Sequence, residues 1–240
     1  MSRVGEGSGR AAQPYAAYGG PAMNIEPHAD TGNDDTESDD TGYDVEDVDR
    51  ERPPASGVLV EQDRGSLPFH LIHGESLVAT AAWAAGEAGI ELIDASVGWD
   101  VVAEREEPLV LHDPLCPMTP PDFLAHCVRT AVDQDAVVVG VRAVTDTIKQ
   151  VEDGRIGATV DREDLVAVCS PIVLPAAVLD DVIAAASRME RWRGSDFAVI
   201  VDWLRSRGHH VLTLDAPPAG RRVSTDSDIA VLEAQTRPVR

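Results

Sequence analysis

The hydrophobic positions of this chain alternate between short, strongly apolar runs and longer helix-forming stretches. The apolar runs are typical of strands buried on both faces of a sheet. They lie at 57–60, 108–113, 136–141, 165–168 and 210–214. The helix-forming stretches lie at 75–89, 119–133, 175–188, 196–207 and 227–236. Strands alternating with helices of about ten or more residues indicate βαβ units, so we predict an α/β fold with a largely parallel sheet.

Individual residues mark where several of these helices begin and end. Thr119 can cap the helix that follows it, with Pro120 in the first turn. Asp196 opens another helix, so an N-cap role explains it without any ligand. Gly89 and Gly208 are expected to end the helices that precede them.

The first 56 residues have a different composition. Gly, Ala, Pro and Ser are frequent, and the acidic run Asp34–Asp40 follows. Such a segment buries too little apolar area to offset its backbone entropy. We therefore predict a disordered acidic tail at 1–56 and one domain at 57–240. Two roles for the tail stay open: a solubilising segment, or an acidic arm that binds a basic partner protein.

The overall charge narrows the class of partner. The chain has 240 residues, 43% of them hydrophobic, and a formal net charge of −22. This charge argues against binding nucleic acid or an anionic membrane surface, because both are polyanions. No run is long and apolar enough to span a bilayer, and the N-terminus lacks a signal-peptide pattern. Cys116, Cys127 and Cys169 are widely spaced, without metal-ligand spacing, so we expect a cytoplasmic protein with free thiols.

Two short motifs suggest where the chemistry lies. Val144–Lys149 and Thr159–Arg162 each place Thr beside Asp and a cation, which could hold an anionic small molecule. Asp113 follows an apolar run, and ligands of parallel sheets sit outside the carboxyl ends of the strands. We therefore expect Asp113 to lie near a ligand.

The order of these motifs resembles one family. His112-Asp113, Asp146-Thr147-Ile148-Lys149, Thr159-Val160-Asp161-Arg162, Ser170-Pro171, Ser195-Asp196 and Arg221–Ile229 follow one another as in 2-C-methyl-D-erythritol 4-phosphate cytidylyltransferases. That family joins CTP to methylerythritol phosphate in isoprenoid biosynthesis and releases pyrophosphate. The resemblance implies a three-layer, Rossmann-like sheet of the nucleotide-diphospho-sugar transferase type, with a small β-arm.

The resemblance also implies site residues, a cofactor and a partner. Asp113 would lie by Mg²⁺ and the triphosphate, whereas Thr147, Arg162, Ser170, Asp196 and Arg222 would bind substrate, a small phosphate ester or a nucleotide. The arm would make a homodimer in which Arg162 reaches the neighbouring site. Each residue can also be explained without a ligand: Asp113 can cap a turn, Asp196 can cap a helix, and the others can be exposed polar side chains.

One part of the family pattern is missing. The family follows its first strand with a loop like Ala-Ala-Gly-x-Gly-x-Arg and then Pro-Lys, which hold the triphosphate. Here the corresponding segment runs from Glu61 to Phe69, with Pro68 at the family's Pro and Phe69 at its Lys. The loop's catalytic Arg and Lys are absent, so we expect a divergent member with lost or weak catalysis. The alternatives are an active nucleotidyltransferase that uses Arg64 or Arg105 as a substitute cation, or an interaction module that uses the tail.

Overall fold

The computed structural model describes residues 52–94, 101–102, 104–186 and 196–237. The chain divides into two units, Met1–Val48 and Asp49–Arg240, and every described residue belongs to the second. Nearly all of the predicted tail therefore lies outside the described residues. Its predicted boundary is slightly late, because the first strand begins at Ala55.

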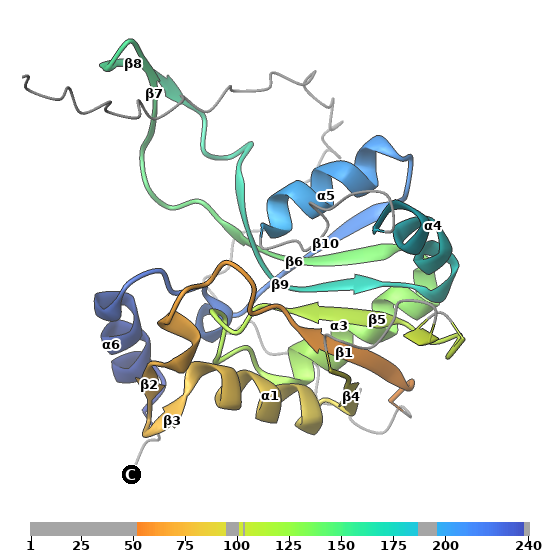
Figure 1. Ribbon diagram of the computed structural model, residues 1–240. Coiled ribbons are helices and arrows are strands. Elements are labelled where there is room, and N and C mark those ends of the chain that lie inside the picture. The colour runs from red at the N-terminus through yellow and green to blue at the C-terminus, as the bar shows by residue number, and fades with distance from the viewer. Residues whose placement is uncertain (1–51, 95–100, 103, 187–195, 238–240) are drawn as a thin grey trace, which may run out of the picture. The chain divides into compact units, whose positions relative to one another are not determined.

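A six-stranded sheet forms the centre of the described unit, in the order β10-β6-β9-β5-β1-β4 (Figure 1). Five strands are parallel and β9 is antiparallel to both of its neighbours, β5 and β6. The strands are β1 (Ala55–Leu59), β4 (Ile90–Leu92), β5 (Leu109–His112), β6 (Val137–Ala143), β9 (Val166–Leu174) and β10 (Val211–Asp215). The predicted α/β class with a largely parallel sheet is confirmed.

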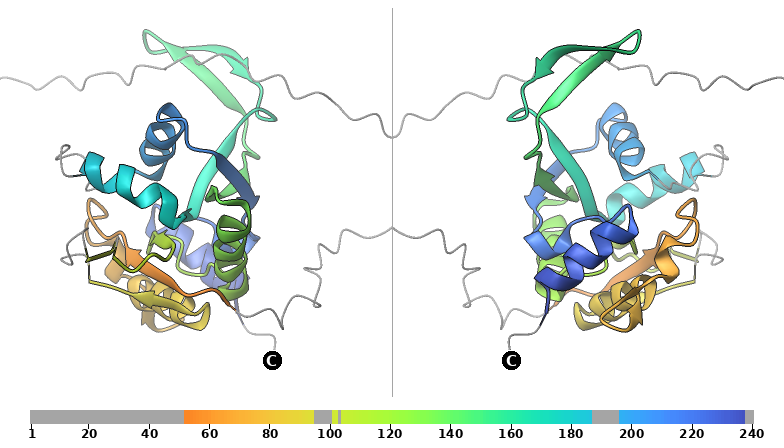
Figure 2. Two further views of the ribbon diagram at one scale, coloured as in Figure 1. Left: turned by 90° about the vertical axis from the view of Figure 1, so that its right-hand side faces the viewer. Right: turned by 90° about the vertical axis from the view of Figure 1, so that its left-hand side faces the viewer.

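Helices cover both faces of this sheet and complete three layers (Figures 1 and 2). Alternate residues of β5 take opposite sides: Val110 packs with α1 and α3, while Leu109 and Leu111 pack with α4 and α5. The helices are α1 (Leu77–Glu87), α3 (Pro121–Gln134), α4 (Ala176–Ala186), α5 (Phe197–Ser206) and α6 (Asp226–Gln235). None of the helices in the described ranges is long and apolar enough to cross a bilayer.

The observed N-cap matches the prediction at one helix and differs from it at another. Asp196 caps α5 by accepting a hydrogen bond from Ala198 N at 2.9 Å, as predicted. Thr119 does not cap α3, so that prediction is wrong. Its hydroxyl donates to Cys116 O at 2.8 Å, and Pro120 takes the N-cap position without a side-chain hydrogen bond.

A two-stranded arm extends away from the central sheet (Figures 1 and 2). It consists of β7 (Ile148–Glu152) and β8 (Arg155–Val160), joined by a turn at Asp153-Gly154 where both φ angles are positive. Such a two-residue turn matches the twist of a β-hairpin. The small β-arm is thus confirmed.

A second hairpin was not expected from the sequence. It pairs β2 (Leu71–Ile72) with β3 (Glu75–Ser76), immediately before α1. Ile72 packs with Leu232 of α6 and with Val223, and Val223 N donates to Leu115 O at 2.7 Å. This packing holds the segment that carries Arg222 against the turn after β5, where the candidate site lies.

Candidate functional site

The candidate site begins where β5 ends. Asp113 follows His112, the last residue of β5, and is 2% exposed. Its Oδ1 accepts a hydrogen bond from Leu115 N at 3.0 Å, and its carbonyl accepts one from Cys116 N at 2.8 Å. This turn, of the kind that Asp favours, fixes the carboxylate at the carboxyl edge of the parallel strands.

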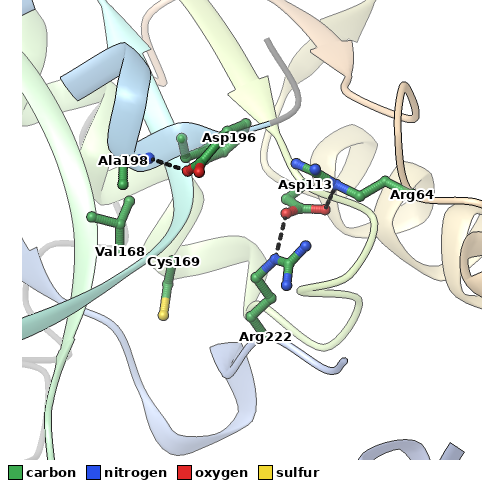
Figure 3. Close-up of a pocket in the computed structure, with 8 residues that line it drawn as sticks. Arg64, Asp113, Val168, Cys169, Asp196, Ala198 and Arg222 are labelled. Atoms are coloured by element: carbon green, nitrogen blue, oxygen red, sulfur yellow. Dashed lines mark hydrogen bonds and ion pairs between the residues drawn. The ribbon is translucent and has the colours of Figure 1, made fainter. Parts of the chain in front are cut away.

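Two arginines bracket the carboxylate of Asp113 (Figure 3). Arg64 Nε lies 3.1 Å from Oδ1, and Arg222 Nε lies 2.9 Å from Oδ2. The side chain of Arg64 is only 5% exposed, whereas that of Arg222 is 37% exposed. Both oxygens of Asp113 are therefore engaged by cations, and the three groups together carry one surplus positive charge.

Arg64 reaches this position through a tight connection. Val60 N donates to His112 O at 2.9 Å, which keeps the chain on β5 as it leaves β1. The chain then turns, with Arg64 N donating to Glu61 O at 3.3 Å and Asp63 at a positive φ of 60°. A single 3₁₀ turn, η2 (Leu67–Phe69), follows. Residues 60–66 therefore connect β1 to η2.

A pocket of about 420 Å³ opens beside the bracketed carboxylate (Figure 3). Asp113 and its two arginines lie on one side of it, and Asp196 lies across from them at the start of α5. Four residues without charged side chains complete the lining. The lining residues are Arg64, Asp113, Val168, Cys169, Asp196, Phe197, Ala198 and Arg222.

Ser170 supports Asp113 from within the fold and does not line the pocket. Its hydroxyl accepts a hydrogen bond from Asp113 N at 3.0 Å and lies 2.5 Å from His112 Nδ1. Both Ser170 and His112 are fully buried. Burial lowers the pKa of His112 to about 4, although the nearby Asp113 charge acts in the opposite direction. His112 is therefore neutral at pH 7, and its hydrogen bond to Ser170 holds the end of β5 against β9.

Comparison with known proteins identifies the family of this chain. A sequence model of the 2-C-methyl-D-erythritol 4-phosphate cytidylyltransferase family matches residues 92–237. The chain belongs to this family. A cytidylyltransferase of Corynebacterium diphtheriae is 29% identical over 171 residues, which are 71% of this chain and 64% of that protein. One of Geobacter metallireducens is 27% identical over 187 residues, 76% of this chain and 78% of that protein.

Solved structures of cytidylyltransferases share the fold. The crystal structure of the Thermus thermophilus protein matches with a TM-score of 0.60 and 20% sequence identity. The match covers 75% of this chain and 97% of the Thermus thermophilus chain. A protein of Anaerococcus prevotii gives a TM-score of 0.57 at 12% identity. The three-layer, nucleotide-diphospho-sugar transferase-like fold predicted from the motif order is thus confirmed.

The structure brings together some of the predicted site residues. Asp113, Asp196 and Arg222 line the pocket, and Ser170 lies directly behind Asp113. Thr147 and Arg162 are exposed near the arm and do not line the pocket. Arg162 Nη1 instead donates to Thr145 O at 2.7 Å. The substrate-binding role of Thr147 and the role of Arg162 in a neighbouring subunit's site remain predictions.

The two proposed substitute cations differ in position. Arg64 lines the pocket, whereas Arg105 does not. Arg105 pairs with Glu91 at 3.1 Å and with Glu107 at 3.3 Å. Sequence reasoning missed the pocket residues Val168, Cys169 and Phe197. Cys169 directly precedes the Ser170-Pro171 motif and Phe197 directly follows Asp196, so proximity to a motif could have indicated both.

The arrangement at Asp113 is a poor fit for the Mg²⁺ that the family resemblance implies. Oδ1 of Asp113 contacts Arg64 Nε and Leu115 N, and Oδ2 contacts Arg222 Nε. A divalent cation at either oxygen would therefore lie close to a guanidinium group of the same sign of charge. Within the described ranges, no group of three or more His, Cys, Asp or Glu side chains could hold a metal ion. The two guanidinium groups on Asp113 leave a surplus positive charge, which opposes the binding of a divalent cation there.

Proposed function

We propose that this chain is a divergent cytidylyltransferase-family protein that binds a small phosphate ester and has lost most or all nucleotidyl transfer. One observation carries the proposal: Arg64, projecting from a tight turn, lies on Asp113 at 3.1 Å. In the family pattern, the corresponding segment is a glycine-containing loop that holds the triphosphate. The turn here brings a cation to the carboxylate and leaves no glycine-rich cradle between β1 and η2.

The charges around the pocket favour a phosphate ester that also carries hydroxyl groups. A guanidinium group can donate two parallel hydrogen bonds to a phosphate, so the phosphate binds beside Arg64 and Arg222. Asp196 accepts hydrogen bonds, which suits a hydroxyl group of the same ligand. The side chains of Val168 and Phe197 contact its carbon skeleton. Methylerythritol phosphate, which forms part of the relatives' enzyme name, has these features.

A nucleoside triphosphate is a poorer fit for this site. Glu61 and Asp63 are exposed in the turn after β1, where the family pattern has glycines and an arginine. Each carboxylate near the triphosphate costs about 1 kcal/mol at surface-like screening. The loss of one preorganised donor to the reacting group lowers turnover roughly a hundredfold or more. Together these changes account for the proposed loss of transfer.

The position of Arg64 also favours a second candidate, an active nucleotidyltransferase in which Arg64 replaces the lost loop arginine. This candidate requires that Arg64 release Asp113 and contact the triphosphate. It differs from the first proposal in one measurable respect, because it requires CTP to bind when Mg²⁺ is present.

We further propose that the β-arm forms a homodimer, as the family resemblance implies. Val151 of β7 and Ile156 of β8 are paired across the arm and are 68% and 78% exposed. An exposed apolar cross-strand pair of this kind is suited to burial against a second chain.

Isothermal titration calorimetry separates the two functional candidates. The first proposal predicts binding of methylerythritol phosphate and no heat from CTP with Mg²⁺. R222M should weaken binding of the ester by about tenfold or more, which is about 1.4 kcal/mol. R205M removes an exposed arginine of α5 outside the pocket and should bind as the wild type does. Saturable CTP binding would favour the active enzyme, and absence of ester binding would contradict the first proposal.

A further inference from the structure

Arg64 is a nearly buried cation whose hydrogen-bonding capacity is mostly unused. Its Nε donates to Asp113 Oδ1, and within the described residues its two Nη nitrogens have no hydrogen-bond partner. An arginine carries five N–H donors, so the four on the two Nη nitrogens of Arg64 remain available to a ligand. Because the side chain lines the pocket, a group inside the pocket is suited to accept these hydrogen bonds.

Arg222 presents a second guanidinium to the same space. Its Nε is anchored on Asp113 Oδ2 at 2.9 Å, and its Nη1 makes one long hydrogen bond, 3.4 Å, to Ser224 Oγ. The carboxylate thus fixes both guanidinium groups through their Nε atoms, which leaves terminal nitrogens for a ligand. One carboxylate neutralises one of the two charges, so a surplus positive charge remains beside the pocket.

Asp196, at the start of α5, lines the other side of the pocket and limits where an anion can bind. One of its oxygens already accepts the hydrogen bond from Ala198 N at 2.9 Å. The carboxylate of Asp196 gives the side of the pocket near α5 a negative charge, which repels a phosphate toward the arginines.

We propose that Arg64 takes the place of a divalent cation at Asp113, so that the pocket binds a phosphate monoester without any metal ion. Asp113 then acts as a fixed counter-ion that orients two arginines, and the arginines supply the positive charge. The identity of the phosphate ester rests on the proposed function. The exclusion of the metal ion rests on the contacts of Asp113 and on the surplus positive charge of the two arginines around it.

The proposal has a direct consequence for a variant that lacks Arg64. In R64M the Oδ1 atom keeps its hydrogen bond from Leu115 N but loses its cation, so a lone pair becomes available to a metal ion. Asp113 keeps Arg222 as a counter-ion in this variant, which limits the loss of stability. Removing Arg64 should therefore create a metal site that the wild type lacks.

Electron paramagnetic resonance of Mn²⁺, used alone as the probe, tests this consequence. The acidic N-terminal segment is the same in every variant, so only differences between variants count. We expect R64M to bind one more Mn²⁺ ion than the wild type, and R64M/D113N to lose that ion. R205M should match the wild type. Equal binding by R64M and the wild type, or a wild-type ion that D113N removes, would overturn the proposal.

A second measurement does not depend on how well R64M folds. Methylerythritol phosphate is titrated into the wild type in the presence of EDTA and then in the presence of Mg²⁺. We expect the two dissociation constants to agree within about twofold, whereas tenfold tighter binding with Mg²⁺ would overturn the proposal. If the ester binds in neither condition, the proposed function fails, and the Mn²⁺ comparison still decides whether Arg64 excludes a metal ion.

Discussion

Arg64 Nε lies 3.1 Å from Asp113 Oδ1, although the two residues are 49 positions apart in the chain. The contact forms because β1 and β5 are parallel neighbours, with Leu59 opposite His112. The chain therefore leaves both strands at the same edge of the sheet, and the turn after β1 places Arg64 beside the residue that follows β5. The same contact holds the carboxylate of Asp113 and a cation together at one side of the pocket.

This ion pair predicts a large loss of stability when its carboxylate is removed. D113N keeps the shape of the side chain but leaves Arg64, which is 5% exposed, without a counter-ion. Removing one partner of a buried ion pair typically costs about 3–5 kcal/mol, so the free energy of unfolding should fall by about that amount in urea denaturation. D122N changes a side chain that is 94% exposed and should remain within about 0.5 kcal/mol of the wild type. A loss below about 1 kcal/mol in D113N would contradict the described burial of this pair.

The close approach of β6 and β9 predicts opposite effects for two Gly-to-Ala substitutions. A Cβ at position 140 would lie 2.6 Å from the Ser170 carbonyl oxygen, and the backbone there cannot move without disturbing Ser170. We expect G140A to lose about 1–3 kcal/mol of unfolding free energy. A Cβ at position 86, in helix α1, meets nothing within 4 Å. G86A should gain about 0.5–1 kcal/mol, and thermal denaturation of both variants checks the contrast.

The buried histidine predicts a pH dependence of stability. The pKa of His112 is lowered from 6.5 to about 4 in the folded chain, because burial disfavours the charged imidazole. As the pH falls below 6.5 the unfolded chain takes up the proton first, so stability decreases between pH 6.5 and about 4 and this effect levels off below that. The shift corresponds to about 3 kcal/mol. H112N should flatten this slope, whereas H126N should retain it.

A carboxylate contributes in a separate pH range, which keeps the two effects distinct. Hydrogen bonds from Arg207 and His209 lower the pKa of Asp181 from 3.8 to about 2. The stability it provides is present above pH 3.8 and is lost as the pH falls toward 2. A wild-type stability that stays constant from about pH 6.5 to about pH 4.5 would therefore count against the neutral, buried His112.

The exposed apolar pair of the arm predicts the oligomeric state. If Val151 and Ile156 are buried between two chains, I156D should convert a dimer to a monomer, because an unpaired charge in an apolar interface is costly. Size-exclusion chromatography with light scattering measures the mass. Q150D adds a charge at an exposed polar position of β7 and should remain dimeric. A monomeric wild type would contradict the proposal directly.

Much of the fold follows from local sequence patterns. Alternating apolar runs and helix-forming stretches placed every α-helix discussed above within about two residues of its observed ends. Helices α3 and α5 have a clear apolar face, and residues that favour helix ends marked several boundaries. The predicted strand at 165–168 was too short, since β9 continues to Leu174. Pro171 lies inside the observed strand, where proline is rare, so local propensity gave no sign that the strand continues.

The site was harder to predict because its main contacts join distant segments. Asp113 was predicted from its position after a strand, and Asp196 and Arg222 from the family's motif order. The contact of Arg64 with Asp113 depends on the geometry of one tight turn, which no local pattern in the sequence specifies. Thr119 does not cap α3 because its hydroxyl donates to Cys116 O, and Cys116 is held in place by its own hydrogen bond to the Asp113 carbonyl.

The central claim is that the family scaffold persists while nucleotidyl transfer has been lost with the triphosphate loop. Pyrophosphate release from CTP and methylerythritol phosphate with Mg²⁺, measured with protein in excess, tests it most directly, with the Thermus thermophilus protein as a positive control. We predict that this chain gives no more pyrophosphate than its D113N variant. Mg²⁺-dependent release at about 1 s⁻¹ or faster, within the usual range of enzymes, would contradict the account.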